Sequence, residues 1–153
     1  MRLINNHYIG IDIIEIARIE KIIARWGERF LRRVYTDLEL RLYRKKPSSL
    51  AARFASKESV MKLLGTGRKG ISWREIETVS HPSGKPLLNL YGRAQIKAKR
   101  LGLKGIAISL SHSRKYAIAL VAGETNFGYP IRVTIGVELP RVRIQRGERV
   151  CFL

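Results

Sequence analysis

The fold is decided by the stretch RFASKESVMKLLGTG, residues 53–67. Pro47-Ser48-Ser49 opens the helix that contains it, because proline suits the first turn of a helix. The glycines of Gly65-Thr66-Gly67 then end that helix after Leu64. The sequence therefore predicts one long helix over residues 47–64, and the other elements are arranged around it.

Charged groups gather on one side of this helix. At about 100° per residue, that side carries Phe54, Lys57, Glu58, Met61, Lys62 and Gly65. Glu58 and Lys62 stand four residues apart, in the order that favours an ordinary helix ion pair. The following segment, residues 65–70, is small and cationic and suits close approach of phosphates, although two glycines after a helix are also a plain C-cap. It lacks the GxxxxGK[ST] pattern of a Walker loop.

A carboxylate interrupts the apolar run that precedes the first helix. Residues Tyr8 to Ile14 are apolar and β-branched around Gly10 and Asp12, which predicts a buried strand. An unpaired buried charge is costly, so Asp12 needs a cation, hydrogen-bond donors or a proton. Magnesium would suit it, because this ion prefers hard oxygen ligands and few protein carboxylates. A structural salt bridge to a lysine or an arginine would suit it equally well.

The remaining elements alternate between helical and strand signals. Thr36-Asp37-Leu38-Glu39 has the pattern of a capping box, and Gly27 stands where a helix C-cap is expected. We expect helices over residues 15–26, 28–34, 36–44 and 91–101, a strand pair over 75–80 and 86–90, and a hairpin over 106–111 and 116–122. The prediction is an α+β fold in which an antiparallel sheet packs on one long helix.

The turn of the predicted hairpin is rich in polar side chains. Ser109-Leu110-Ser111-His112-Ser113 could offer contacts to a ligand, or it could be a plain turn with one satisfied histidine. A serine hydrolase is disfavoured, because the GxSxG elbow is absent.

Composition limits the class of protein. The 153 residues include 45% hydrophobic residues, which is too many for a disordered chain and enough for one packed domain. A single cysteine, Cys151, rules out a disulfide framework within the chain. Neither a span of 18 apolar residues nor a signal-peptide core is apparent, so we expect a cytoplasmic protein without a membrane anchor.

Charge points to an anionic partner. Thirty basic and 12 acidic residues give a formal net charge of +18. The partner could be a nucleic acid, an anionic membrane surface, an acidic protein or a phosphate-rich ligand. Alternatively, the basic surface could serve only solubility or heat stability. Only scattered aromatic residues and no zinc pattern accompany the charge, so nucleic acid is not the expected partner.

Several of these pieces occur together in one order. They are GIDI at 10–13, EIARI at 15–19, RFASKES at 53–59, KLLGTG at 62–67, ISW at 71–73, IE at 76–77, GKP at 84–86, SLSHS at 109–113, YA at 116–117 and VAGE at 121–124. This order resembles the holo-acyl-carrier-protein synthases, the small phosphopantetheinyl transferases of fatty-acid synthesis, over about residues 7–124. The pairing of GxD near the start with FxxKExxxK in the long helix is specific in combination.

The resemblance implies a reaction. Members of this family move 4′-phosphopantetheine from coenzyme A to a serine hydroxyl of an apo acyl carrier protein and release adenosine 3′,5′-bisphosphate. The family requires magnesium and typically forms homotrimers with sites at subunit interfaces. The resemblance therefore implies coenzyme A as co-substrate, an acidic carrier protein as partner and no nucleophile in this chain.

The resemblance also implies roles for individual residues. Asp12 and Glu58 would hold magnesium, and Lys62 would lie near the phosphates and assist the leaving group. Deprotonation of the acceptor serine could involve Glu58 or a metal-bound water. Further nucleotide contacts are implied for Arg53, Gly65, Thr66, Gly67, Pro86, Ser109 and His112.

A docking surface for the carrier is expected on the first helix. Residues 18–46 carry 10 basic and 4 acidic residues, a net charge of +6. Arg18 and Arg25 share a helix with Ile22, which makes a basic face with an apolar centre that suits an acidic helix of the partner.

The resemblance ends before the chain does. We expect a phosphopantetheinyl transferase domain over residues 1–124 and a C-terminal extension over residues 125–153. Two rival functions are a nucleic-acid-binding module, which rests on charge alone, and a coenzyme A binder without catalysis, which the presence of Asp12, Glu58 and Lys62 disfavours.

Overall fold

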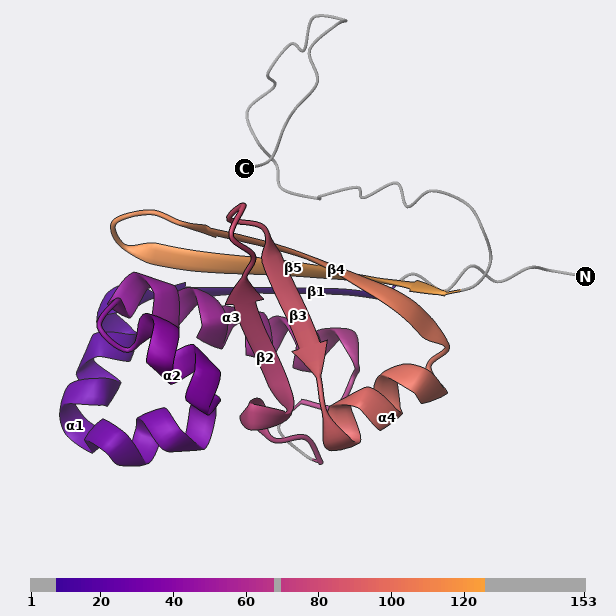
Figure 1. Ribbon diagram of the computed structural model, residues 1–153, viewed down its shortest axis with the longest axis horizontal. Helices are drawn as coiled ribbons and strands as arrows, with labels where there is room; N and C mark the ends of the chain where they lie inside the picture. Colours follow the sequence, from indigo (N-terminus) through magenta and orange to yellow (C-terminus); the bar gives the residue numbers. More distant parts are fainter. Residues whose placement is uncertain (1–7, 68–69, 126–153) are drawn as a thin grey trace, which may run out of the picture.

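The computed structural model describes residues 8–67 and 70–125 (Figure 1). Its elements are β1 (Tyr8–Glu15), α1 (Ile16–Val34), α2 (Asp37–Tyr43), α3 (Pro47–Leu63), the 3₁₀ turn η1 (Trp73–Glu75), β2 (Ile76–Ser80), β3 (Pro86–Leu90), α4 (Gly92–Arg100), β4 (Leu103–His112) and β5 (Tyr116–Thr125). The predicted α+β class and the long helix at residues 47–64 are confirmed. The expected extension lies beyond the described residues, apart from Thr125.

The strands form two antiparallel sheets. One has three strands in the order β1-β5-β4, and the other has two, β2 and β3. In the larger sheet Asp12 of β1 lies opposite Ala119 of β5. The hairpin of β4 and β5 is longer than the sequence predicted, since it spans ten residues in each strand.

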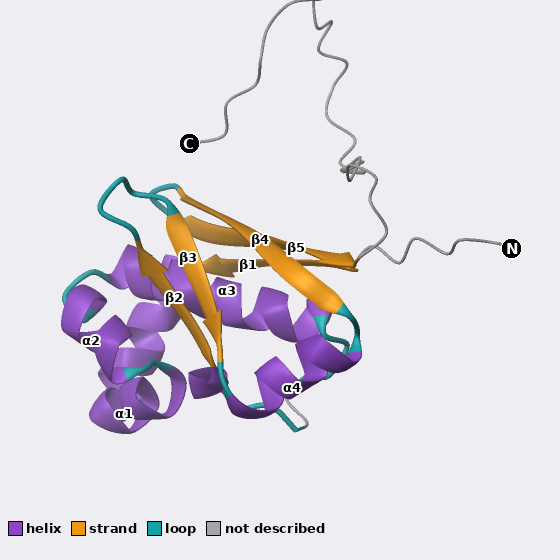
Figure 2. Cartoon of the chain, turned by 45° about the vertical axis from the view of Figure 1, so that its right-hand side comes forward, coloured by secondary structure: helices purple, strands orange, loops and turns teal. Residues whose placement is uncertain are grey.

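Helix α3 is the centre of the molecule. It lies between the three-stranded sheet and the β2–β3 pair, as Figure 2 shows, and it bonds to both. The hydroxyl of Ser59 donates to the carbonyl of Ala119 in β5 at 3.0 Å, and that of Ser56 lies 2.6 Å from the hydroxyl of Thr78 in β2. These bonds on two sides keep the backbone of α3, and so the starting point of each functional side chain, in a fixed position.

Strand β1 approaches α3 very closely at one point. A Cβ atom on Gly10 would overlap the backbone carbonyl of Ser59 in α3. Glycine is therefore required here for the distance between two backbones, and not for an unusual backbone conformation. Because Asp12 follows in the same strand, this contact sets how far its carboxylate stands from α3.

Two helix ends lie where the sequence predicted them. Gly27 has a φ of 49° and breaks α1 into two helical parts, so the predicted C-cap at this residue is confirmed. Thr36 accepts a hydrogen bond from the amide of Glu39, and Glu39 accepts one from the amide of Thr36, which confirms the capping box.

One member of the predicted charged side of α3 turns out to be a core residue. The ammonium of Lys57 lies 2.8 Å from the carboxylate of Glu39, and both side chains are fully buried. Burial lowers the pKa of Lys57, and the carboxylate of Glu39 opposes that shift. Lys57 therefore joins α3 to α2 inside the protein, although it reaches the same residue, Trp73, as the neighbouring Glu58.

The apolar residues of β1 are not all buried. Ile9, Ile11 and Ile13 are 46%, 46% and 61% exposed, while Gly10 and Ile14 face α3 and are buried. All the helices lie on the other face of the three-stranded sheet (Figure 1). The prediction of a fully buried strand is therefore wrong for alternate residues, because only one face of this sheet is covered within the described residues.

Candidate active site

The carboxylate of Asp12 points from β1 toward the end of α3. Its Oδ1 atom lies 2.7 Å from the ammonium of Lys62, which also donates to the carbonyl of Ile11 at 2.9 Å. The helix pair expected between Glu58 and Lys62 is therefore not formed, because Lys62 reaches across to the neighbouring strand. Its side chain is 53% exposed, so it has room to move when a ligand arrives.

The carboxylate of Glu58 has a different partner. The indole Nε1 of Trp73 donates a hydrogen bond of 2.7 Å to its Oε1 atom. The ring of Trp73 lies 6.0 Å from that of Phe54, and Phe54 lies 6.4 Å from Phe30, measured between ring centroids. An aromatic row from α1 to η1 thus forms one wall beside Glu58.

One cavity of about 350 Å³ brings much of the expected site together. It is lined by Asp12, Ile13, Ile14, Arg18, Ile22, Phe30, Phe54, Glu58 and Trp73. The two expected metal ligands and two of the three expected docking residues therefore share a single hollow. Arg25 stands outside it, with its guanidinium 5.2 Å from the ring of Trp26.

The donor set of this cavity fits a magnesium ion. Asp12 and Glu58 supply hard oxygen ligands, and within residues 8–67 and 70–125 no cluster of three or more histidine, cysteine or acidic side chains forms a metal cage. Magnesium is commonly held by one or two carboxylates and completed by water and substrate phosphates. A site with two carboxylates beside a mobile lysine suits that kind of coordination better than a structural metal.

The glycine turn after α3 has the backbone conformation that the sequence suggested. Gly65 and Gly67 have φ values of 66° and 52°, which side chains rarely adopt. Among the described side chains, the hydroxyl oxygen of Thr66 is the one buried polar atom that lacks a hydrogen-bond partner. Thr66 borders a hollow of about 280 Å³ together with Lys97 and Arg100 of α4.

A second set of expected residues meets in another cavity, of about 730 Å³. It is lined by Arg53, Ser80, Ser83, Gly84, Lys85, Pro86, Ile108, Ser109 and Leu110. Three of the predicted nucleotide contacts, Arg53, Pro86 and Ser109, are thus brought together. This cavity shares no lining residue with the carboxylate cavity.

The guanidinium of Arg53 is held by the protein itself. It donates to the hydroxyl of Ser80 at 2.9 Å and lies 3.6 Å from the ring centroid of Tyr43. Arg53 is 6% exposed, so it can offer a fixed positive charge at the cavity wall. His112 stands at the exposed end of β4, and it is not among the residues that line this cavity.

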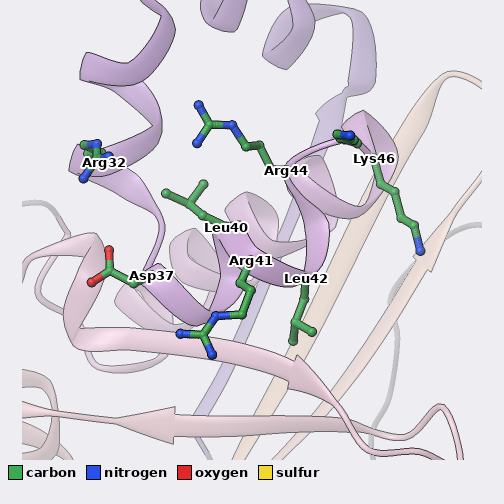
Figure 3. A pocket seen from close by; sticks show the side chains of 8 residues that line it. Arg32, Asp37, Leu40, Arg41, Leu42, Arg44 and Lys46 are labelled. Atoms are coloured by element: carbon green, nitrogen blue, oxygen red, sulfur yellow. The ribbon is translucent and has the colours of Figure 1, made fainter.

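A third cavity, of about 620 Å³, is strongly cationic (Figure 3). It lies between the end of α1 and α2 and is lined by Arg32, Asp37, Leu40, Arg41, Leu42, Arg44, Lys45 and Lys46. Arg32 and Arg44 both pair with Glu28, while Arg41, Lys45 and Lys46 form no ion pair within the described part of the chain. None of the predicted site residues lines this cavity.

Comparison with known protein families identifies the family of this chain. The model of the 4′-phosphopantetheinyl transferase superfamily matches residues 8–121, which is about three quarters of the chain. The chain belongs to this superfamily. The resemblance to its holo-acyl-carrier-protein synthases is confirmed, and the chain is an enzyme of this phosphopantetheinyl transferase family.

Individual relatives agree with the family assignment. The holo-[acyl-carrier-protein] synthase of Dehalococcoides mccartyi is 54% identical over 117 residues, which cover 76% of this chain and 98% of that protein. The crystal structure of the Helicobacter pylori synthase in complex with coenzyme A has a TM-score of 0.69 and 36% identity over 76% of this chain and 99% of that one. That of the Bacillus anthracis synthase with coenzyme A has a TM-score of 0.64 and 33% identity, over 78% and 96%.

Sequence reasoning missed the aromatic side of this phosphopantetheinyl transferase site. Trp73 appeared only within the matched motif ISW, and Phe30 was given no role. No local pattern signals that an indole 15 residues from Glu58 will donate to its carboxylate. The turn that carries Trp73 has a readable signal, because Ser72 and Glu75 form a second capping box.

Within the described residues of this phosphopantetheinyl transferase, no helix is long and apolar enough to cross a lipid bilayer.

Proposed function

We propose that this enzyme transfers 4′-phosphopantetheine from coenzyme A to a serine hydroxyl of an apo acyl carrier protein. Adenosine 3′,5′-bisphosphate is the second product, magnesium is required, and the reaction serves fatty-acid synthesis in the cytoplasm. The observation that carries the proposal is the shared cavity of Asp12 and Glu58, with Lys62 at its edge, in a chain of this family.

The carboxylate cavity takes the reacting end of coenzyme A. Asp12 and Glu58 hold the magnesium ion, which supplies charge neutralisation for the pyrophosphate. Lys62 exchanges its bond with Asp12 for a phosphate oxygen, and its positive charge then stabilises the departing bisphosphate. The attacking hydroxyl comes from the carrier, and among the described residues no serine, threonine, cysteine or lysine side chain lines this cavity.

The nucleotide end of coenzyme A needs a second surface. The exposed turn of Gly65, Thr66 and Gly67 continues from α3, and its lack of bulk permits close approach of phosphates. The cavity of Arg53, Pro86 and Ser109 supplies positive charge and apolar contact for the rest of the nucleotide, together with His112 at the end of β4.

We propose that this enzyme forms a homotrimer, as its family resemblance implies, and two observations support contact between subunits. Arg53 and Glu58 are five residues apart on α3, so they stand about 140° apart around its axis and open on different sides. The uncovered face with Ile9, Ile11 and Ile13 offers an apolar surface for contact between subunits. We propose that the carboxylate cavity of one subunit and the nucleotide cavity of the next form one complete site.

Mixed oligomers test that arrangement. Co-assembled chains that carry Glu58→Gln or Arg53→Leu should regain part of the activity that each variant lacks alone, because some sites receive both intact halves. Sedimentation should give about three times the 17.5 kDa chain mass. A monomer, or variants that never complement each other, would place the whole site within one chain.

The first half of α1 is proposed as the carrier-docking surface. Arg18 and Ile22 line the same cavity as the two carboxylates, so a carrier helix bound there lies beside the reacting phosphate. Arg25 lies one turn further along, on an exposed part of the helix. Acidic residues of the carrier would bind this basic face, and the attraction between the opposite charges would raise the association rate of the two proteins.

We propose residues 1–124 as the catalytic domain and residues 125–153 as a C-terminal extension of unknown role. The family model matches within the first segment, and the curated relatives cover about three quarters of the chain.

Mass spectrometry of the carrier tests the proposed reaction. Apo acyl carrier protein is incubated with the enzyme, coenzyme A and magnesium, and a parallel sample contains a chelator. We expect the carrier to gain the mass of one phosphopantetheine with magnesium and none with the chelator. No gain on a carrier that a known transferase does modify would instead favour a coenzyme A binder without catalysis.

A further inference from the structure

Glu58 is held by a neutral aromatic donor. The hydrogen bond from the indole Nε1 of Trp73 to Oε1 of Glu58 is 2.7 Å long, and bonds to an ionised carboxylate are among the stronger ones in proteins. The bond therefore fixes the carboxylate group and occupies one of its two oxygens. Glu58 lines the carboxylate cavity, and its other oxygen, Oε2, takes no part in this bond.

Trp73 is itself fixed by the helix that carries Glu58. The ammonium of Lys57 donates to the backbone carbonyl of Trp73 at 3.1 Å, and Lys57 is fully buried and paired with Glu39. The indole ring packs against Phe54, one turn earlier on α3. A closed loop results, in which Lys57 holds the backbone of residue 73 and the side chain of residue 73 holds the adjacent Glu58.

The chemistry of the donor matters as much as its position. An indole N–H donates a hydrogen bond but neither accepts one nor carries a charge. It therefore orients Glu58 without cancelling the negative charge that attracts a cation. The carboxylate of Asp12 has a charged partner instead, because the ammonium of Lys62 forms an ion pair with it.

We propose that Trp73 is a positioning residue of this site, which presents Oε2 of Glu58 to a divalent cation while leaving the charge of the carboxylate intact. The inference rests on the proposed function in one respect, namely that Glu58 binds a divalent cation. It adds a residue from η1 to a site whose expected ligands come from β1 and α3.

Direct binding of magnesium tests the role of Trp73. The substitution Trp73→Phe keeps an aromatic ring against Phe54 and removes the N–H donor. Isothermal titration of the full-length chain with magnesium chloride should then show affinity weaker by roughly 10- to 100-fold, the loss typical of a hydrogen bond to a charged group. The KM for the carrier protein should change less than the magnesium affinity, because Arg18 and Ile22 of α1, rather than Trp73, are the residues proposed to meet the carrier.

A matched control removes a buried donor elsewhere. Tyr35→Phe deletes a hydroxyl that donates to the carbonyl of Leu50 at 3.0 Å, in a fully buried side chain that does not line the carboxylate cavity. This variant should lose thermal stability and keep the magnesium affinity of the unmodified protein. Equal losses of affinity in the two variants would show a general effect of weakened packing and would overturn the proposal.

A double substitution shows whether Trp73 acts through Glu58 or through the general stability of the fold. In a Glu58→Gln background, Trp73→Phe should weaken magnesium binding no further, because its effect passes through Glu58. Additive losses, or a Trp73→Phe protein that binds magnesium normally, would overturn the inference. Carrier modification by the unmodified protein is the separate test of the proposed function, so a failure there is distinguishable from a failure here.

Discussion

The two carboxylates of the cavity differ in the side chain to which each is bonded. Asp12 and Glu58 line one cavity, yet one pairs with a lysine and the other with an indole. The lysine can leave on its flexible stem, whereas the indole is packed in place. The pair therefore combines a carboxylate whose partner can leave with one whose partner is fixed, which would suit the magnesium ion proposed above.

Removing either carboxylate should abolish most of the activity. Asp12→Ala or Glu58→Ala is expected to lower the transfer rate by roughly 100-fold or more, because a metal ion contributes several kcal/mol to stabilising the developing charge. Rates are measured at limiting magnesium, and thermal unfolding checks that the fold persists. A variant with near-normal turnover would remove its residue from the metal site.

A methyl group at position 10 should be costly. Gly10→Ala would place a Cβ against the carbonyl of Ser59 and force β1 away from α3, at a cost of about 1–3 kcal/mol in the free energy of unfolding. Urea denaturation measures this cost. Gly105→Ala is the matched control, since nothing lies within 4 Å of its added Cβ, and a similar loss there would contradict the explanation.

Elements in this protein are joined by buried polar groups as well as by apolar packing. Glu77 of β2 accepts hydrogen bonds from Thr36 before α2 and from Asn89 and Tyr91 at the end of β3. Burial raises the pKa of Glu77, but these hydrogen bonds outweigh it and hold the pKa below its ordinary value of 4.5. The network ties the helical half to the β2–β3 pair.

This network predicts how stability changes with pH. A carboxyl whose pKa is lower in the folded state contributes stability above its unfolded pKa, and that contribution is lost as pH falls through the folded value. Glu77→Gln should therefore lower the free energy of unfolding by about 1–3 kcal/mol at pH 7, and by progressively less as the pH falls below 4.5 through the lowered pKa of the folded state. A series of urea titrations from pH 7 downward checks this, with the exposed Glu124→Gln as control. A loss that is independent of pH would show that charge is not involved.

The elements were predictable where their signals are local. The capping box at Thr36 and Glu39, the break at Gly27 and the end of α3 all depend on neighbours within four residues, so a pattern shows them. The bond between Lys57 and Glu39 depends on tertiary packing, and no spacing announces it. For the same reason the hydrogen bond from Trp73 to Glu58 was not foreseen, although Asp12 and Glu58 were both expected at one site and do line one cavity.

Strand β1 shows why apolar character alone misleads. The sequence indicates that Ile9, Ile11 and Ile13 favour burial, but not what would bury them. In the described residues their face is open, because the helices lie on the opposite side of the sheet. A contact between subunits leaves the same sequence signal as a contact within one subunit.

At the scale of the whole molecule, the positive charge on the surface should affect binding of the carrier protein more strongly than it affects the rate of catalysis. Reversing Arg18 and Arg25 to glutamate should raise the KM for carrier protein by roughly tenfold or more, since both face the proposed carrier and add to its attraction. The KM for coenzyme A should change far less. Steady-state kinetics with each substrate varied in turn provides the measurement.

The control for that experiment changes net charge by the same amount elsewhere. Lys99→Glu with Lys104→Glu alters two exposed cations, one on α4 and one on β4, that line none of the cavities described above. Equal effects of the two double variants on the carrier would mean that overall charge, and not the face of α1, attracts the partner.

The cationic cavity between α1 and α2 has a practical consequence at the purification bench. Its unpaired cations, added to a net charge of +18, will draw RNA and DNA fragments out of a cell lysate at low salt. An elevated absorbance at 260 nm in a fresh preparation, which falls after a wash in molar salt, is then a property of the charge distribution. Retention on a nucleic-acid column would accordingly be a poor guide to the biological role of this chain.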